Sequence, residues 1–230
     1  MEKRVKALFK IFRKEQYRDE FKKGLLYFNT LEFFKNIEDP CKFCIADDCE
    51  GVVGFYQPDK IKLQFGRLDI TDLAGPVTIR KNDLACYNLL SLASINDGEF
   101  KASEKYTLEE IKKGYSFLES INSIGDYAIL ITDTNEFIHR IEIVAKEQNY
   151  TLMRGLVEYY DSRTFNGNFS CPNKFFHKKN EFSYQKEYRF VLEKNERKNA
   201  PIVLNIGNIS DICVDLFTRE INDKISIKVN

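Results

Sequence analysis

The chain has 230 residues, and its 35 lysines and arginines are balanced by 35 aspartates and glutamates. This balance argues against a chain-wide field that attracts nucleic acid or anionic membranes, although it is compatible with a local basic patch. No apolar run reaches the ~18 residues of a membrane span, and no secretion signal is recognisable. We therefore expect one cytoplasmic α+β domain over residues 1–230, with mixed, mostly antiparallel sheets flanked by three or four helices.

The first forty residues predict a strand, a helix, a second strand and a helical turn. Gly24 suits the end of the helix, and either Asn29 or Thr30 can cap the turn through its side chain. The turn must end before Pro40, because the residue before a proline disfavours helical backbone. The predicted elements are a strand at 5–12, a helix at 14–23, a strand at 25–28 and a turn around 31–34.

The remainder of the chain predicts strands interrupted by two amphipathic helices. Thr107 and Glu110 have the spacing of a capping box at the start of the first helix. In the second helix, Phe137, Ile138 and Ile141 recur on one face. Helices are predicted at 107–122 and 135–148, and strands near 51–56, 61–65, 77–80, 85–93, 127–132, 152–160, 202–206 and 212–216.

The stretch FSYQKEYRF at 182–190 places three strong polar groups at alternating positions. If it forms one strand, Gln185, Glu187 and Arg189 project from the same face, opposite a mostly aromatic row. A carboxylate, an amide and a guanidinium on one surface suit a catalytic or binding face. They equally suit an exposed face on which Glu187 and Arg189 form an ordinary ion pair.

Cysteines are concentrated in a polar loop that we predict between residues 39 and 51. Cys41 and Cys44 form a CxxC pair and Cys49 follows, so that Cys171 or His177 would complete a tetrahedral zinc site. The second CxxC pair of a strong zinc signature is missing, and a loop with reduced thiols explains the same residues. A structural zinc and free thiols both remain open interpretations.

Common catalytic motifs do not decide the reaction. No Walker P-loop, GxGxxG turn, GxSxG elbow or HExxH helix occurs in the sequence. Cysteine–histidine catalysis has only His139, on the more polar side of a predicted helix, and His177, just before the Gln185 segment. A metal-dependent nuclease is a further alternative, because four acidic residues could bind a divalent cation: Asp47, Asp48, Glu50 and Glu187.

Several segments resemble the signatures of a diverse, mostly uncharacterised family of bacterial and prophage proteins. They are GLLYFNTLEFF at 24–34, DDCEG at 47–51, GDYAILI at 125–131, EFIHR at 136–140, FHK at 176–178 and YQKEYR at 184–189. The resemblance covers most of the chain and implies a phage or mobile-element protein that acts in conflict between phage and host. The cysteine-rich insert departs from the family pattern, so the resemblance implies nothing about a metal.

The late segment also resembles ADP-ribosyltransferase folds, which carry a Gln/Glu-x-Glu pair on a late strand, an early basic residue and a polar strand segment between them. This resemblance implies that Glu187 hydrogen-bonds the nicotinamide ribose of NAD and stabilises positive charge as nicotinamide leaves, while Gln185 orients the acceptor. An early arginine would hold a phosphate. The candidate catalytic residues are thus Gln185, Glu187 and Arg189, and the candidate NAD-binding residues are Arg4, Arg13, Asn29, Thr30 and His177.

Two functions remain in view beside the nuclease. The first is an ADP-ribosyltransferase-like enzyme with NAD as donor. The second is a non-catalytic protein that binds and inhibits a bacterial defence complex, in the manner of an anti-CRISPR protein; its 19 Phe and 12 Tyr are side chains of the kind that dominate interface hot spots. Both functions imply a host protein or a protein–nucleic-acid complex as the partner.

Overall fold

The computed structural model describes residues 5–36, 49–81, 87–97, 100, 103–170, 173–194, 196 and 198–227. Its main sheet contains β1 (Val5–Phe12), β2 (Leu25–Thr30), β7 (Tyr87–Asn96), β8 (Tyr127–Ile131), β9 (Thr151–Leu156), β13 (Glu187–Glu193), β14 (Ile202–Asn205) and β15 (Cys213–Phe217). The strands run in the order β14-β2-β7-β1-β8-β15, in which β2 and β1 pair with different parts of the same edge of β7. β13 pairs with the opposite edge of β7, and β9 pairs with β13. All these pairs are antiparallel, which confirms the predicted α+β class.

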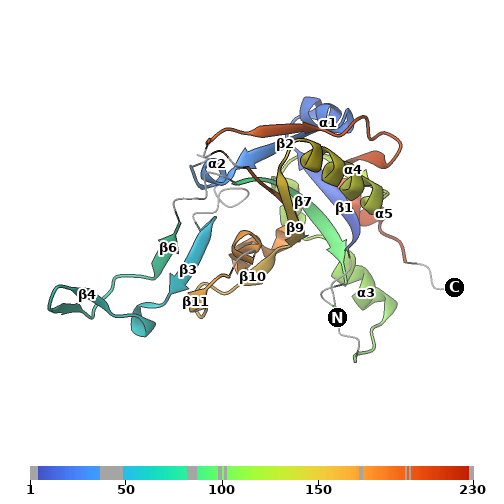
Figure 1. The fold of residues 1–230 in the computed structure, drawn as a ribbon. Coiled ribbons are helices and arrows are strands. Elements are labelled where there is room, and N and C mark those ends of the chain that lie inside the picture. The colour runs from blue at the N-terminus through green and yellow to red at the C-terminus, as the bar shows by residue number, and fades with distance from the viewer. Residues whose placement is uncertain are drawn as a thin grey trace.

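Three smaller sheets lie beside the main one. They are the parallel pair β10 (Glu158–Tyr160) and β12 (His177–Lys179), the sheet of β11 (Gly167–Asn168), β3 (Val52–Tyr56) and β6 (Val77–Arg80), and the hairpin β4 (Leu63–Phe65) and β5 (Leu68–Ile70). Figure 1 shows β3, β6 and the hairpin as an arm that extends away from the main sheet.

Helices cover both faces of the main sheet. On one face, Phe21 of α1 (Glu15–Lys22) and Phe137 and Ile141 of α4 (Thr134–Glu147) join the largest apolar cluster. On the other face, Phe117 and Ile221 pack in a second cluster. The remaining α-helices are α2 (Leu31–Asn36), α3 (Leu108–Tyr115) and α5 (Ile221–Lys224), and 3₁₀ turns occur at Pro58–Lys60, Glu119–Ser123, Asn173–Phe175, Asn180–Gln185 and Thr218–Glu220.

Two of the predicted helix starts are confirmed in atomic detail. The Phe33 amide donates to Thr30 Oγ1 at 3.1 Å, so Thr30 caps α2. The Thr107–Glu110 capping box is present at α3. However, α3 ends at Tyr115 instead of continuing to residue 122, because the backbone of Phe117 exchanges two 2.8 Å hydrogen bonds with the Asn222 side chain.

The prediction of one continuous strand over 182–190 is wrong. Residues up to Gln185 form a 3₁₀ turn, Lys186 adopts a left-handed conformation with φ of 43°, and β13 begins only at Glu187. Tertiary contacts hold this turn: the Lys186 carbonyl accepts from the Ser94 amide at 2.8 Å, and Lys186 Nζ donates to the Gly114 carbonyl at 2.5 Å. Within β13 the alternation holds, since Tyr188, Phe190 and Leu192 enter the largest apolar cluster.

We expect Gly24→Ala to lower the free energy of unfolding by about 2 kcal/mol or more. Gly24 has φ of +89°, and an added Cβ would lie 1.9 Å from the Gly207 carbonyl oxygen. Chemical denaturation measures the change. Gly75→Ala is the matched control because a Cβ there meets no atom within 4 Å; equal stabilities of the two variants would refute the expectation.

Candidate functional site

The main sheet splits where β1 and β2 share one edge of β7. Phe9 of β1 pairs with Ala93, and Asn29 of β2 pairs with Leu89. Beyond Phe9, β8 is the only described strand that pairs with β1, and this pairing continues through Phe12. The three residues of β7 between these contacts, 90–92, therefore face the gap between the diverging strands.

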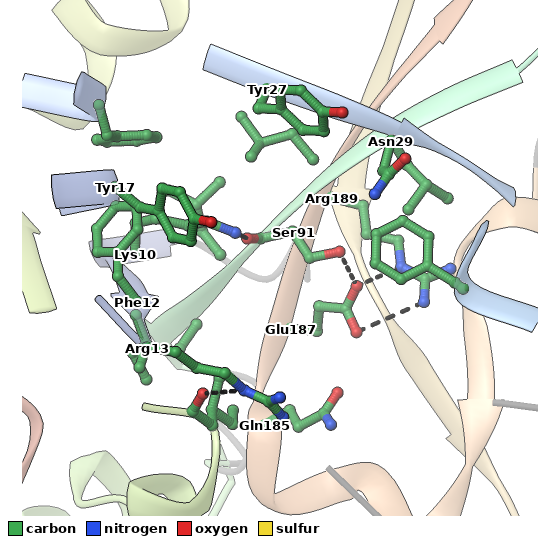
Figure 2. Close-up of a pocket in the computed structure, with 18 of the residues that line it drawn as sticks. Lys10, Phe12, Arg13, Tyr17, Tyr27, Asn29, Ser91, Gln185, Glu187 and Arg189 are labelled. Carbon is green, nitrogen blue, oxygen red and sulfur yellow. Dashed lines mark hydrogen bonds and ion pairs between the residues drawn. The ribbon is translucent and has the colours of Figure 1, made fainter. Parts of the chain in front are cut away.

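A cavity of about 630 Å³ occupies this split. This volume lies within the range of about 300 to 1,000 Å³ found for small-molecule sites. Six aromatic side chains contribute to the wall: Phe12, Tyr17, Phe21, Tyr27, Phe33 and Phe34. In Figure 2, Lys10 and Phe12 approach from β1, Tyr27 and Asn29 from β2, and Ser91, Glu187 and Arg189 point toward one another between them.

Arg189 is the centre of a buried ion cluster in the cavity wall. Its side chain is only 1 % exposed, and its two terminal nitrogens donate to Glu50 Oε1 at 2.6 Å and Oε2 at 2.8 Å. Nη1 also donates to the Phe175 carbonyl at 2.7 Å, and Nε donates to Glu187. A bidentate pair of this kind fixes the guanidinium plane and therefore the direction of both carboxylates.

Glu187 accepts hydrogen bonds from three different side chains. Ser91 Oγ donates at 2.5 Å, Lys178 Nζ at 2.9 Å, and Arg189 Nε completes the set. Burial alone would raise the pKa of Glu187, but the charges of Arg189 and Lys178 outweigh it and hold the pKa well below its usual range. The carboxylate is therefore ionised at neutral pH although its side chain is 3 % exposed.

Gln185 joins the same wall from the preceding turn. Its Oε1 accepts from Lys178 Nζ at 2.9 Å, so one ammonium group positions both Gln185 and Glu187. The structure thus brings Gln185, Glu187 and Arg189 together along the cavity, as predicted, although Gln185 does not belong to the strand. The alternative of an exposed ion pair does not describe them, because Glu187 and Arg189 are buried.

Lys10 is a cavity residue that the sequence reasoning missed. Its Nζ donates to the Ser91 carbonyl at 2.7 Å, across the gap that opens where β1 leaves β7. Burial lowers the pKa of Lys10 to about 8, opposed by the negative charge of Glu187. Lys178 and Ser91 were also missed. The position of Lys10 between Phe9 and Ile11 in an apolar run was the available signal for it; nothing in the sequence distinguished the other two.

Some of the predicted NAD-binding residues line the cavity and others do not. Arg13 and Asn29 line the cavity, and Arg13 Nε donates to the Ile124 carbonyl at 3.4 Å. Thr30 does not line it, because its side chain caps α2. His177 also lies outside the lining: its ring packs against Phe169, with centroids 4.4 Å apart, and its Nε2 is 3.6 Å from Glu158. Arg4 lies outside the described residues.

The metal predictions are only partly covered by the structure. Cys41, Cys44 and Cys171 lie outside the described residues, and Cys49 is half-buried. Within the described ranges, no group of three or more His, Cys, Asp or Glu side chains could hold a metal ion. Of the acidic residues considered for a nuclease, Glu50 and Glu187 both bind Arg189, while Asp47 and Asp48 lie outside the described ranges.

No protein-family model, curated protein or solved structure matches this chain. Among the residues that the structure describes, no helix has both the length and the apolar character needed to cross a membrane.

We expect Lys10→Met to raise the free energy of unfolding at pH 7 by about 1 to 2 kcal/mol. A pKa near 8 in the folded state and 10.5 in the unfolded chain means that the charged form opposes folding by up to about 3 kcal/mol at neutral pH. Loss of the hydrogen bond to the Ser91 carbonyl offsets about 1 kcal/mol of this stabilisation. Between pH 8 and 10.5 the unfolded chain binds the extra proton, so wild-type stability rises with pH in this window and the advantage of the variant shrinks.

Denaturant unfolding of both proteins at pH 7 and pH 10 measures this effect. Lys6→Met is the control on the same strand, because Lys6 is 46 % exposed and forms a surface pair with Asp97 at 3.3 Å. A Lys10→Met protein that is less stable than wild type at pH 7 would show that the partly buried ammonium is net stabilising.

Proposed function

We propose that the protein is a cytoplasmic enzyme that transfers ADP-ribose from NAD, with the nicotinamide half of NAD bound in the split of the main sheet. The observation that carries the proposal is Glu187: an ionised carboxylate, fixed by three donors, in the wall of a ligand-sized cavity. The resemblance of the late segment to ADP-ribosyltransferase folds supports the same assignment. The resemblance to bacterial and prophage proteins suggests a role in conflict between phage and host.

Burial of these charges costs free energy, which an apolar cluster of similar volume would avoid. Such an arrangement occurs more often where chemistry requires a fixed charge. Here the guanidinium of Arg189 and the hydroxyl of Ser91 hold one carboxylate oxygen of Glu187, and Lys178 holds the other. The carboxylate is consequently preorganised, and little reorganisation is needed when positive charge develops nearby.

Glu187 would act on the bond between nicotinamide and its ribose. As this C–N bond breaks, its electron pair leaves with nicotinamide, and Glu187 stabilises the positive charge that develops at the anomeric carbon. A nucleophile of the acceptor then forms the new bond to that carbon and loses its proton to solvent water. Gln185, held by Lys178, is positioned to orient the acceptor.

The residues of the cavity fit NAD. Tyr17, Tyr27 and Phe33 offer aromatic faces for a planar nicotinamide ring. Asn29 offers an amide for ribose hydroxyl groups, and Arg13 supplies a cation for a phosphate. NAD would therefore supply an activated glycosidic bond, while the side chains of this chain bind it, orient it and stabilise the developing charge.

Arg13→Ala is expected to raise the KM for NAD about tenfold, because a charge-assisted contact to a phosphate contributes about 1.5 kcal/mol or more. The effect on kcat should be smaller, since Arg13 does not contact Glu187. Steady-state nicotinamide release measures both constants. Arg163→Ala is the control, because Arg163 is 88 % exposed and pairs only locally with Asp161; an unchanged KM in Arg13→Ala would remove Arg13 from the site.

A binding function is the second candidate, and the hairpin of β4 and β5 favours it. The pairs Leu63–Ile70 and Phe65–Leu68 share one face of this hairpin, and Phe65 and Leu68 are 80 % and 66 % exposed. Exposed apolar groups at this density are typical of protein-binding surfaces. Phe65→Glu with Leu68→Glu would abolish the biological effect of a pure binding protein, whereas Glu187→Gln would leave that effect intact.

A further inference from the structure

Among the described strands, none pairs with one edge of β2 over residues 25–28, which are four of its six residues. The Gly24 carbonyl accepts from Ile206 at the β14 edge, so hydrogen-bonded pairs with β14 recur at Leu26 and Phe28. The backbone N–H and C=O groups of Leu25 and Tyr27 therefore point to the opposite edge, into the split. There, pairing with β7 begins only at Asn29, and no other described strand pairs with β2 on that side.

The side chains beside this open edge are apolar and exposed. Tyr27 is 53 % exposed and Leu25 is 37 % exposed, and both line the cavity. Val203 of β14 pairs with Tyr27 and continues the exposed apolar row, at 49 %. The sequence LLYF at 25–28 contains none of the lysines or prolines that usually protect an open strand edge from pairing.

We propose that β2 binds an extended protein segment by strand addition at Leu25 and Tyr27, and that this segment carries the acceptor of the transferred group. Only a polypeptide backbone offers donors and acceptors that alternate with the spacing of a strand. Because the edge borders the cavity, a side chain of the added segment can project toward Gln185 and Glu187. The assignment as acceptor rests on the proposed function; the strand addition itself does not.

The charges around the edge favour a protein segment over a nucleic acid. Cationic side chains of the neighbouring α1 already have acidic partners: Arg18 lies 2.8 Å from Glu15 and 2.9 Å from Asp19. Lys22 lies 2.7 Å from Asp215. A phosphate backbone would need uncompensated cations along its path, whereas an apolar peptide requires none.

Selection from a display library of random twelve-residue peptides tests the proposal without NAD. We expect wild type to enrich peptides with alternating apolar residues, and Tyr27→Lys to bind them at least tenfold more weakly. Ile143→Lys is the control, because Ile143 is an apolar residue of α4 that is 43 % exposed and neither lines the cavity nor lies on the strand edge. In an added strand, only every second peptide amide donates to β2. N-methylation of either the odd-numbered or the even-numbered amides should therefore abolish binding, and N-methylation of the other set should not.

Hydrogen exchange on the wild-type protein gives a second readout that needs no variant. The Tyr27 amide should exchange at least tenfold more slowly with an enriched peptide bound, while the Tyr17 amide is unchanged. The proposal is overturned if no peptide binds wild type more tightly than Tyr27→Lys. It is also overturned if N-methylation of neither set of amides weakens binding, or if the Tyr27 amide gains no protection from hydrogen exchange. A protein that binds peptides in this way but does not cleave NAD would retain the strand addition and lose the enzymatic function.

Discussion

Arg189→Met should lower the free energy of unfolding by about 3 to 5 kcal/mol, because it leaves two buried carboxylates without their shared counter-charge. Glu50 would lose both of its hydrogen bonds to the guanidinium, and Glu187 would keep only Ser91 and Lys178. This loss is comparable with the whole stability of many domains, so the variant should be largely unfolded near physiological temperature. Denaturant unfolding followed by circular dichroism measures it.

Arg154→Met on the neighbouring strand β9 is the matched control. Its guanidinium pairs with Glu142 at 3.1 Å, and both side chains are more than 40 % exposed. We expect it to cost less than about 1 kcal/mol. Combining Arg189→Met with Glu50→Gln should recover part of the lost stability, since one of the uncompensated charges is then removed. Equal stabilities of Arg189→Met and Arg154→Met would contradict the buried cluster.

Glu187→Gln should reduce the rate of nicotinamide release by about 10³-fold, as expected when a preorganised electrostatic group is removed from a water-poor site. The amide has nearly the same shape, and its oxygen can still accept from Ser91 and Arg189, so the change removes the charge and the acceptor that faces Lys178. NAD binding measured by calorimetry should be nearly unchanged, because the charge acts mainly on the transition state.

Glu193→Gln is the matched control for this loss. Glu193 lies at the far end of the same strand, where it accepts from the Tyr87 hydroxyl at 2.9 Å and does not line the cavity. Its rate should equal that of wild type. A decrease of less than about tenfold in Glu187→Gln, in protein shown to be folded, would exclude Glu187 from the chemistry.

The local elements were predictable because their signals are local. The strand at Val77–Arg80 has the predicted bounds, and α4 differs from its predicted range by one residue at each end. The capping box at Thr107 and the cap at Thr30 also depend on residues only three positions apart. Hydrophobic periodicity and helix caps were therefore sufficient to predict the α+β class without tertiary information.

The candidate site was predictable only in part, because it is assembled by pairing between distant strands. The turn at Lys186 depends on Ser94 and Gly114, which no local pattern connects to it. From the sequence alone, Lys10 and Lys178 look like ordinary surface lysines. Only the strand pairing shows that β1 separates from β7 and that both lysines line the resulting cavity. The alternation of Glu187 and Arg189 did indicate their common face, but not that this face is buried.

Chromatography of NAD incubated with the wild-type protein measures directly whether this cavity cleaves the bond to nicotinamide. We expect nicotinamide to accumulate with wild type, alone or with a bacterial lysate as a source of acceptors. Glu187→Gln should bind NAD but release almost no nicotinamide. NAD that stays intact with folded wild-type protein under both conditions, or equal release by the two proteins, would contradict an NAD-cleaving site in the split of the sheet.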